Sequence, residues 1–131
     1  MFFSQGIDIV DNERIKKNYL KYGNHFLNKF LTRKEIQHIS KKRLNLFSRI
    51  ANRFAAKEAT IKAIGTGFRN GITFKNIEIL NDKNGKPLII CDEKILNHLK
   101  KIDINIDNSK FYLSISDEKK YSVAIVSILN F

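Results

Sequence analysis

The stretch from Arg49 to Gly67 reads RIANRFAAKEATIKAIGTG and constrains the fold more than any other part of the chain. At about 100° per residue, its apolar spacing predicts one long helix over about 44–64. Glu58 falls on the core-facing side of this helix, about 40° from Phe54. An ionised carboxylate on that side costs several kcal/mol unless it is paired, hydrogen-bonded or bound to a metal. Glu58 is therefore a candidate functional residue. The apolar residues that define this side are Phe47, Ile50, Phe54 and Ile61.

The helix alone leaves two interpretations of Glu58 open. Lys62 follows Glu58 by four residues, which is the favoured order for an ion pair on a partly exposed helix. The ending Gly65-Thr66-Gly67 instead favours a binding site, because small residues stop the helix and let backbone N–H groups approach a phosphate.

The charge balance favours an anionic partner. The 131 residues include 24 Lys and Arg against 13 Asp and Glu, for a net charge of +11. Nucleic acid, anionic lipid, a phosphorylated small molecule and an acidic protein all match this charge. Part of the excess is expected from a composition rich in Lys, Ile and Asn. The length predicts one domain over 1–131.

The apolar residues are distributed as in a soluble protein. No run approaches the about 20 apolar residues of a membrane-spanning helix, and the first residues lack the basic start and long apolar run of a signal peptide. We therefore expect a cytoplasmic protein with no membrane partner. Cys91 is the only cysteine, which excludes a disulfide framework and predicts a buried, inert thiol.

A second acid lies in the first predicted strand, over 2–10. Period-2 alternation directs Ile7 and Ile9 to one face and Asp8, with its neighbour Gly6, to the other. The glycine leaves space beside the Asp8 carboxylate. An Asp near a strand end also serves as a turn or capping residue, so both interpretations stay open.

The remaining pattern predicts an α+β fold, in which an antiparallel sheet packs against one long central helix plus shorter helices. A closing hairpin and an Asn-Gly turn supply the strongest strand signals. In chain order, the other expected elements are a helix over 12–22 capped by Asp11, a short helical or irregular segment at 25–31, a helix over 33–41 with a capping box of Thr32 and Glu35, a strand over 72–80, a turn at 81–85, a strand over 87–91, a helix over 93–101, and strands over 111–116 and 121–129.

The first predicted helix is amphipathic and basic. Ile15 and Tyr19 supply its apolar side. This helix presents either a solvated surface or a docking surface for an acidic partner, and the local sequence favours neither. Its basic residues are Arg14, Lys16, Lys17 and Lys21.

The two inward acids, Asp8 and Glu58, are typical ligands of Mg²⁺, which binds one or two carboxylates together with phosphates and water. Lys62, one helical turn from Glu58, would neutralise the same phosphates. The residues thus predict a metal and phosphate site, but they do not by themselves name a reaction.

Several motifs, in order and spacing along the whole chain, resemble the holo-[acyl-carrier-protein] synthases, the small 4'-phosphopantetheinyl transferase family. The most specific is the run from Lys57 to Gly67, K-E-A-x-x-K-A-x-G-T-G. The motifs are Gly6-Ile7-Asp8-Ile9-Val10, Arg53-Phe54-Ala55-Ala56-Lys57-Glu58-Ala59 with Lys62-Ala63 and Gly65-Thr66-Gly67, Asn84-Gly85-Lys86-Pro87, and Leu113-Ser114-Ile115-Ser116.

The resemblance implies transfer of 4'-phosphopantetheine from coenzyme A to a serine of apo acyl carrier protein, a step of fatty acid biosynthesis that releases adenosine 3',5'-bisphosphate. It further implies a homotrimer with the nucleotide in a cleft between subunits. Asp8 and Glu58 would hold Mg²⁺ on the pyrophosphate, and Lys62 would neutralise charge as the bond breaks. Glu58 would orient the water that takes the serine proton, with Glu35 as a second candidate base.

The resemblance also assigns binding residues. Five positions would contact coenzyme A, and three positions on the basic helix would dock the acidic carrier protein. The coenzyme A positions are Arg53, Lys62, Gly65, Thr66 and Pro87, and the docking positions are Arg14, Lys17 and Lys21.

Asp117 departs from the family pattern. The family usually has His directly after the Ser-x-Ser strand, where it approaches the coenzyme A phosphates. An acid there repels a phosphate unless it is protonated or turned away. Lys119 or Lys120 in the same turn is a candidate substitute.

Two other function classes stay open. A basic nucleic-acid-binding domain explains the charge, but the chain has no aromatic RNA-binding motif, zinc spacing or reading helix, and we expect no nucleic-acid partner. An inactive relative that only binds carrier protein is consistent with Asp117.

Overall fold

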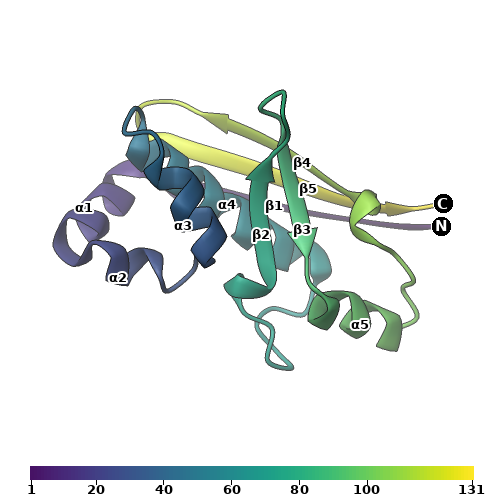
Figure 1. Cartoon of the computed structure of the whole chain (residues 1–131). Helices are drawn as coiled ribbons and strands as arrows, with labels where there is room; N and C mark the ends of the chain where they lie inside the picture. The colour runs from purple at the N-terminus through teal and green to yellow at the C-terminus, as the bar shows by residue number, and fades with distance from the viewer.

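The computed structural model describes residues 1–131 as a mixed α+β fold, as predicted. Figure 1 shows α1, α2 and α3 at one end of the molecule and α5 at the other. The elements are β1 (Phe2–Asp11), α1 (Asn12–Tyr22), α2 (Asn24–Leu27), α3 (Arg33–Ser40), α4 (Leu46–Ile64), β2 (Ile77–Asn81), β3 (Pro87–Cys91), α5 (Glu93–Lys101), β4 (Phe111–Asp117) and β5 (Tyr121–Asn130), with 3₁₀ turns at Phe74–Asn76 and Asn108–Lys110.

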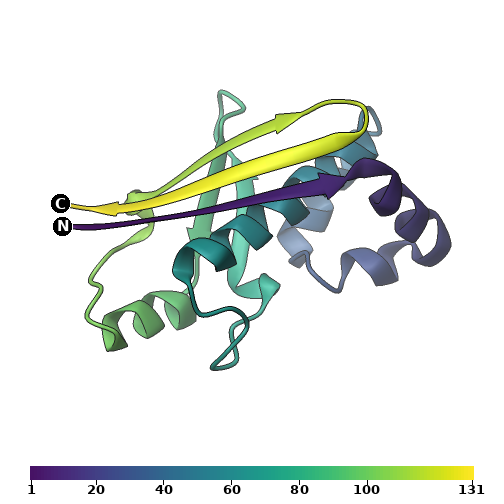
Figure 2. The same ribbon diagram turned by 180° about the vertical axis from the view of Figure 1, so that it is seen from behind.

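The strands form two antiparallel sheets, whereas the sequence indicated one. The larger has the order β1-β5-β4, and β2 and β3 form a separate two-stranded ribbon. Helix α4 contacts β1 and β5 on one side and β2 on another, so it lies between the sheet and the ribbon (Figures 1 and 2). This central position explains its composition, because alanines let the neighbouring strands approach closely. The fully or nearly fully buried alanines of α4 are Ala51, Ala55, Ala56, Ala59 and Ala63.

Gly6 is required where β1 crosses α4. A Cβ atom at Gly6 would lie 2.0 Å from the Ala59 carbonyl oxygen and 2.6 Å from the Ala63 backbone nitrogen. Only glycine therefore lets the strand pass this close to the helix. The same crossing brings Asp8, two residues later, to the α4 side of the sheet.

Both ends of the central helix differ little from the prediction. Helix α4 begins at Leu46, close to the predicted 44, and ends at Ile64, as predicted. Its C-cap is Gly65, whose φ of 88° is left-handed and whose N–H donates to the Ile61 carbonyl. The capping box of Thr32 and Glu35 is present at the start of α3, and Asp11 caps α1. Capping chemistry thus predicted these boundaries correctly.

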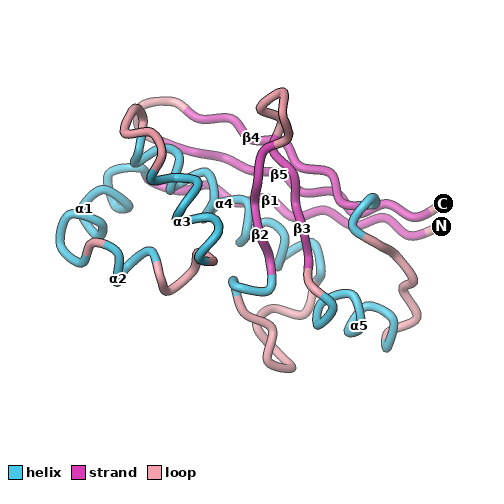
Figure 3. Tube along the Cα trace, in the orientation of Figure 1, coloured by secondary structure: helices cyan, strands magenta, loops and turns pink.

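The predicted strand over 72–80 is wrong in its first half. Asn76 Oδ1 accepts from the Thr73 N–H at 2.7 Å, and Thr73 Oγ1 accepts from the Lys75 N–H at 3.2 Å. These bonds fold 74–76 into a 3₁₀ turn, so β2 begins only at Ile77. The loops of this region stand out in Figure 3 between the end of α4 and β2.

The outer face of the three-stranded sheet has no helix over it (Figure 2). As the alternation predicts, Gly6 and Val10 are buried on the inner face. Ile7 and Ile9 point outward and are 59% and 63% exposed. Phe3 is also exposed on this strand, so β1 presents three apolar side chains on the outer face.

Two smaller expectations are also testable in the structure. Cys91 is a buried free thiol, and burial raises its pKa to about 12, which confirms an inert cysteine.

None of the helices combines the length and the apolar character needed to cross a membrane.

Candidate active site

Asp8, Glu58 and Lys62 line one small pocket of about 300 Å³. Asp8 comes from β1, whereas Glu58 and Lys62 come from successive turns of α4. Arg14 of α1 and Phe54 of α4 complete part of the wall. The structure thus brings together the three residues predicted for catalysis, and we call their surroundings the acidic pocket.

Lys62 pairs with Asp8 rather than with Glu58. Its Nζ donates to Asp8 Oδ1 at 3.1 Å and to the Ile7 carbonyl oxygen at 3.0 Å. The ion pair between Glu58 and Lys62, one of the two interpretations of the sequence, does not form. Lys62 remains 53% exposed, so its ammonium group is accessible from the pocket.

The two acids of the acidic pocket affect each other electrostatically. Burial raises the pKa of Glu58, and the Asp8 carboxylate raises it further, while Lys62 opposes the shift. No group of three or more His, Cys, Asp or Glu residues in the chain is placed so that it could hold a metal ion by itself. A cation bound here would take its remaining ligands from water and phosphate, and this donor set fits Mg²⁺.

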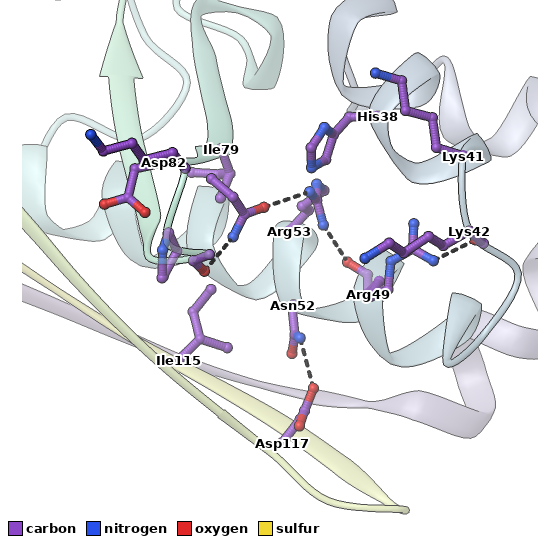
Figure 4. Close-up of a pocket in the computed structure, with 14 residues that line it drawn as sticks. His38, Lys41, Lys42, Arg49, Asn52, Arg53, Ile79, Asp82, Ile115 and Asp117 are labelled. Atoms are coloured by element: carbon purple, nitrogen blue, oxygen red, sulfur yellow. Dashed lines mark hydrogen bonds between the residues drawn. The ribbon is translucent and has the colours of Figure 1, made fainter.

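A second pocket of about 590 Å³ lies between α3, α4, the β2–β3 turn and the end of β4 (Figure 4). We call it the cationic pocket. Arg53 and Pro87 line it, whereas the other predicted coenzyme A positions, Lys62, Gly65 and Thr66, do not. The predicted binding residues are therefore divided along α4. The basic side chains that line the cationic pocket are Lys41, Lys42, Arg49, Arg53 and Lys83.

Arg53 is a buried cation without an acidic partner. It is 6% exposed, and its guanidinium donates only to Asn81 Oδ1 at 3.3 Å and to the Arg49 carbonyl at 3.4 Å. Its Nε has no hydrogen-bond partner. Burial lowers its pKa, against the effect of Glu35. Such a group is stabilised by an anion, because a buried charge needs compensation.

Comparison with known proteins identifies the family of this chain. Residues 4–126 match the family model of the 4'-phosphopantetheinyl transferase superfamily. The chain belongs to this superfamily. Its relatives include a holo-[acyl-carrier-protein] synthase of Pelagibacter ubique, 50% identical with 92% of this chain and 91% of the relative covered, and one of Wolbachia pipientis, 42% identical with 98% of each covered.

Solved structures of the superfamily have the same fold. The holo-[acyl-carrier-protein] synthase of Neisseria meningitidis is 34% identical, with a TM-score of 0.84 and coverage of 97% of this chain and 98% of that one. The Helicobacter pylori synthase, solved in complex with coenzyme A, is 32% identical, with a TM-score of 0.77 and coverage of 93% and 96%. These structures confirm the predicted family and fold class.

Asp117, which departs from the pattern of the phosphopantetheinyl transferases, lies at the edge of the cationic pocket. Its Oδ2 accepts a hydrogen bond of 2.7 Å from Asn52 Nδ2 (Figure 4). Neither Lys119 nor Lys120 lines this pocket, since Lys119 lies in a neighbouring hollow. The proposed lysine substitution for the family's histidine is therefore not seen in this chain.

Glu35 is not available as a general base. It is fully buried in an ion pair with Lys57, and it also accepts from the backbone N–H groups of Thr32 and Ile79, each at 2.9 Å. Lys57 Nζ donates to the Phe30 carbonyl at 2.7 Å as well. The pair satisfies backbone groups of several segments around α4, so its role is structural. No local sequence pattern predicts this pairing, because Glu35 lies on α3 and Lys57 on α4.

Several residues of the cationic pocket were not predicted from the sequence. His38 is an exposed residue of α3 that lines this pocket. Burial and the nearby charges of Arg53, Lys41 and Arg49 lower its pKa. The run from Lys41 to Arg43 directly before α4 was the available signal, because basic residues there can reach the same side as Arg53.

The predicted docking residues Arg14, Lys17 and Lys21 are all exposed on α1. Arg14 also lines the acidic pocket. The basic side of α1 therefore adjoins Asp8 and Glu58, which a docking surface for a substrate protein requires.

Proposed function

We propose that this chain transfers 4'-phosphopantetheine from coenzyme A to a serine of apo acyl carrier protein, with release of adenosine 3',5'-bisphosphate. The names of its relatives support this reaction. The observation that carries it is the meeting of Asp8, Glu58 and Lys62 in one pocket. Phosphoryl transfer chiefly requires positioning and neutralisation of charge, and these residues suit both tasks.

In the proposed mechanism, Asp8 and Glu58 would hold Mg²⁺. When bound, the metal supplies positive charge to the pyrophosphate and to the departing phosphate. The serine Oγ forms a bond to the β-phosphorus of coenzyme A, and the bond from this phosphorus to the bridging oxygen breaks. Lys62 neutralises charge on the phosphates, and Glu58 orients the water that receives the serine proton.

We propose that the coenzyme A contacts come from more than one subunit. Arg53 and Pro87 line the cationic pocket, whereas Lys62 lines the acidic one. We propose that the cationic pocket of one subunit faces the acidic pocket of its neighbour, with Gly65 and Thr66 beside the pyrophosphate. The exposed apolar face with Ile7 and Ile9 supports such an assembly, because large exposed apolar patches mark interfaces. We propose a homotrimer.

The proposed carrier-protein site is the basic side of α1. Acyl carrier protein is acidic, and complementary charge raises the association rate and the specificity of an encounter. Arg14 lies on α1 and also lines the acidic pocket. A carrier protein bound to α1 would therefore present its serine near Asp8. The proposed role is in fatty acid biosynthesis in the cytoplasm.

The decisive experiment is intact-mass spectrometry of apo acyl carrier protein after incubation with this protein, coenzyme A and Mg²⁺. We expect a mass increase of one phosphopantetheine, lost with EDTA and in Asp8→Ala and Glu58→Ala. Glu118→Ala, which removes an exposed acid outside both pockets, is the matched control and should retain transfer. Coenzyme A binding without transfer would contradict the proposal and indicate an inactive relative.

A further inference from the structure

The cationic pocket contains an acid that should weaken the binding of phosphates. Two acids line it, Asp82 and Asp117. Asp82 Oδ1 accepts hydrogen bonds from the backbone N–H groups of Asn84 at 2.8 Å and Lys86 at 2.9 Å. The Asp82 carboxylate is therefore fixed within the β2–β3 turn. Asp117 has no ion pair with any Lys or Arg, although basic residues surround the pocket.

Asn52 holds the Asp117 side chain. The bond of 2.7 Å from Asn52 Nδ2 is the only side-chain hydrogen bond of Asp117. In Figure 4 the two residues lie together on one side of the pocket, apart from the cluster of Arg49, Lys41 and Lys42. Asn52 directly precedes Arg53 on α4, so the helix fixes the position of the Asn52 amide relative to the Arg53 guanidinium.

The arrangement is not optimal for stability. Asn52 Oδ1 is buried without a hydrogen-bond partner, and such an unsatisfied atom in a folded protein calls for an explanation. Its orientation follows from the bond to Asp117, because the amide presents its N–H to the carboxylate and leaves its oxygen unpaired.

We propose that Asn52 is a positioning residue for the nucleotide of coenzyme A. By holding the Asp117 carboxylate at the edge of the cationic pocket, it keeps a negative charge away from the phosphates that Arg53 attracts. Asn52 thus makes an acid at position 117 compatible with an anion site. This inference rests on the proposed function, since it assumes that the nucleotide enters this pocket.

The test is a double-mutant cycle of Asn52→Ala and Asp117→Ala, read by calorimetric binding of adenosine 3',5'-bisphosphate and by KM for coenzyme A. Asn52→Ala should raise both Kd and KM about fivefold at low salt, with kcat within about twofold, because the freed carboxylate repels the phosphates. Asp117→Ala alone should lower both constants slightly. The double variant should behave like Asp117→Ala.

A purely structural bond predicts a different pattern. In that case Asp117→Ala would weaken binding as much as Asn52→Ala, and the double variant would not recover, which would overturn the inference. An unchanged Kd in Asn52→Ala would overturn it too. Asn97→Ala is the control, because it removes an amide from an exposed residue of α5 outside the cationic pocket. If the unchanged protein binds the bisphosphate but transfers nothing, the proposed function fails while the cycle still decides the role of Asn52. If it neither binds nor transfers, both proposals fail.

Discussion

Glu58 lowers the stability of the metal-free chain. Its pKa is raised by burial and by Asp8, so the folded chain binds its proton more tightly than the unfolded chain does. Its contribution to stability is full below the ordinary pKa of 4.5 and is lost as pH rises through the folded value. At neutral pH, the Glu58 carboxylate therefore opposes folding in the site where a metal is proposed to bind.

We expect Glu58→Gln to raise the melting temperature at pH 7 in EDTA by about 1–3 °C, because solvent screening keeps the effect small. The gain should disappear below about pH 4, where Glu58 is protonated in both states. Thermal unfolding followed by circular dichroism from pH 4 to 8 measures this. The exposed Glu118→Gln serves as control, and an equal gain there would contradict the explanation.

At the scale of elements, the crossing of β1 over α4 fixes the distance between the two acids. Gly6→Ala should destabilise the chain by roughly 1–3 kcal/mol, because the added Cβ meets the rigid backbone of Ala59 and Ala63. By moving β1 outward, it should also weaken Mn²⁺ binding at Asp8 and Glu58. Urea unfolding and electron paramagnetic resonance measure the two effects. Loss of stability with unchanged Mn²⁺ affinity would show that the crossing does not set the site.

Helix α1 allows a test of carrier docking. Reversing charge with Arg14→Glu and Lys21→Glu should raise KM for acyl carrier protein about tenfold and leave KM for coenzyme A unchanged, since the charges act on the protein partner. The steady-state assay varies one substrate at a time. Lys100→Glu with Lys101→Glu makes the same charge change on α5 and should have little effect. An unchanged carrier KM in the α1 variant would contradict the docking surface.

On the scale of the whole molecule, much of the fold was predictable because local signals agree with the tertiary structure. Thr32, Asp11 and Gly65 mark helix ends by chemistry that acts within a few residues. The two-sheet arrangement and the pair of Glu35 and Lys57 were not predictable, because they depend on contacts between distant segments. Family motifs indicated Asp8 and Glu58, whereas no motif indicated Asn52. The single-domain organisation stays a prediction.

The exposed outer face of the sheet makes assembly testable. Ile7→Glu with Ile9→Glu should yield monomers by light scattering and abolish transfer, because burying these charges between subunits is unfavourable. Ile102→Glu places one such charge at an exposed apolar residue after α5 and should leave the assembly intact. A trimer that persists in the double variant would contradict an interface on this face.

The division of the predicted ligands between two pockets also has a genetic consequence. If each catalytic centre combines the acidic pocket of one subunit with the cationic pocket of another, two inactive variants of this protein can complement each other. Co-expression of Asp8→Ala with Arg53→Met should restore partial transfer, because some mixed assemblies contain one centre with both halves intact. Either variant expressed alone should stay inactive. No recovery in verified mixed assemblies would place both halves within a single polypeptide.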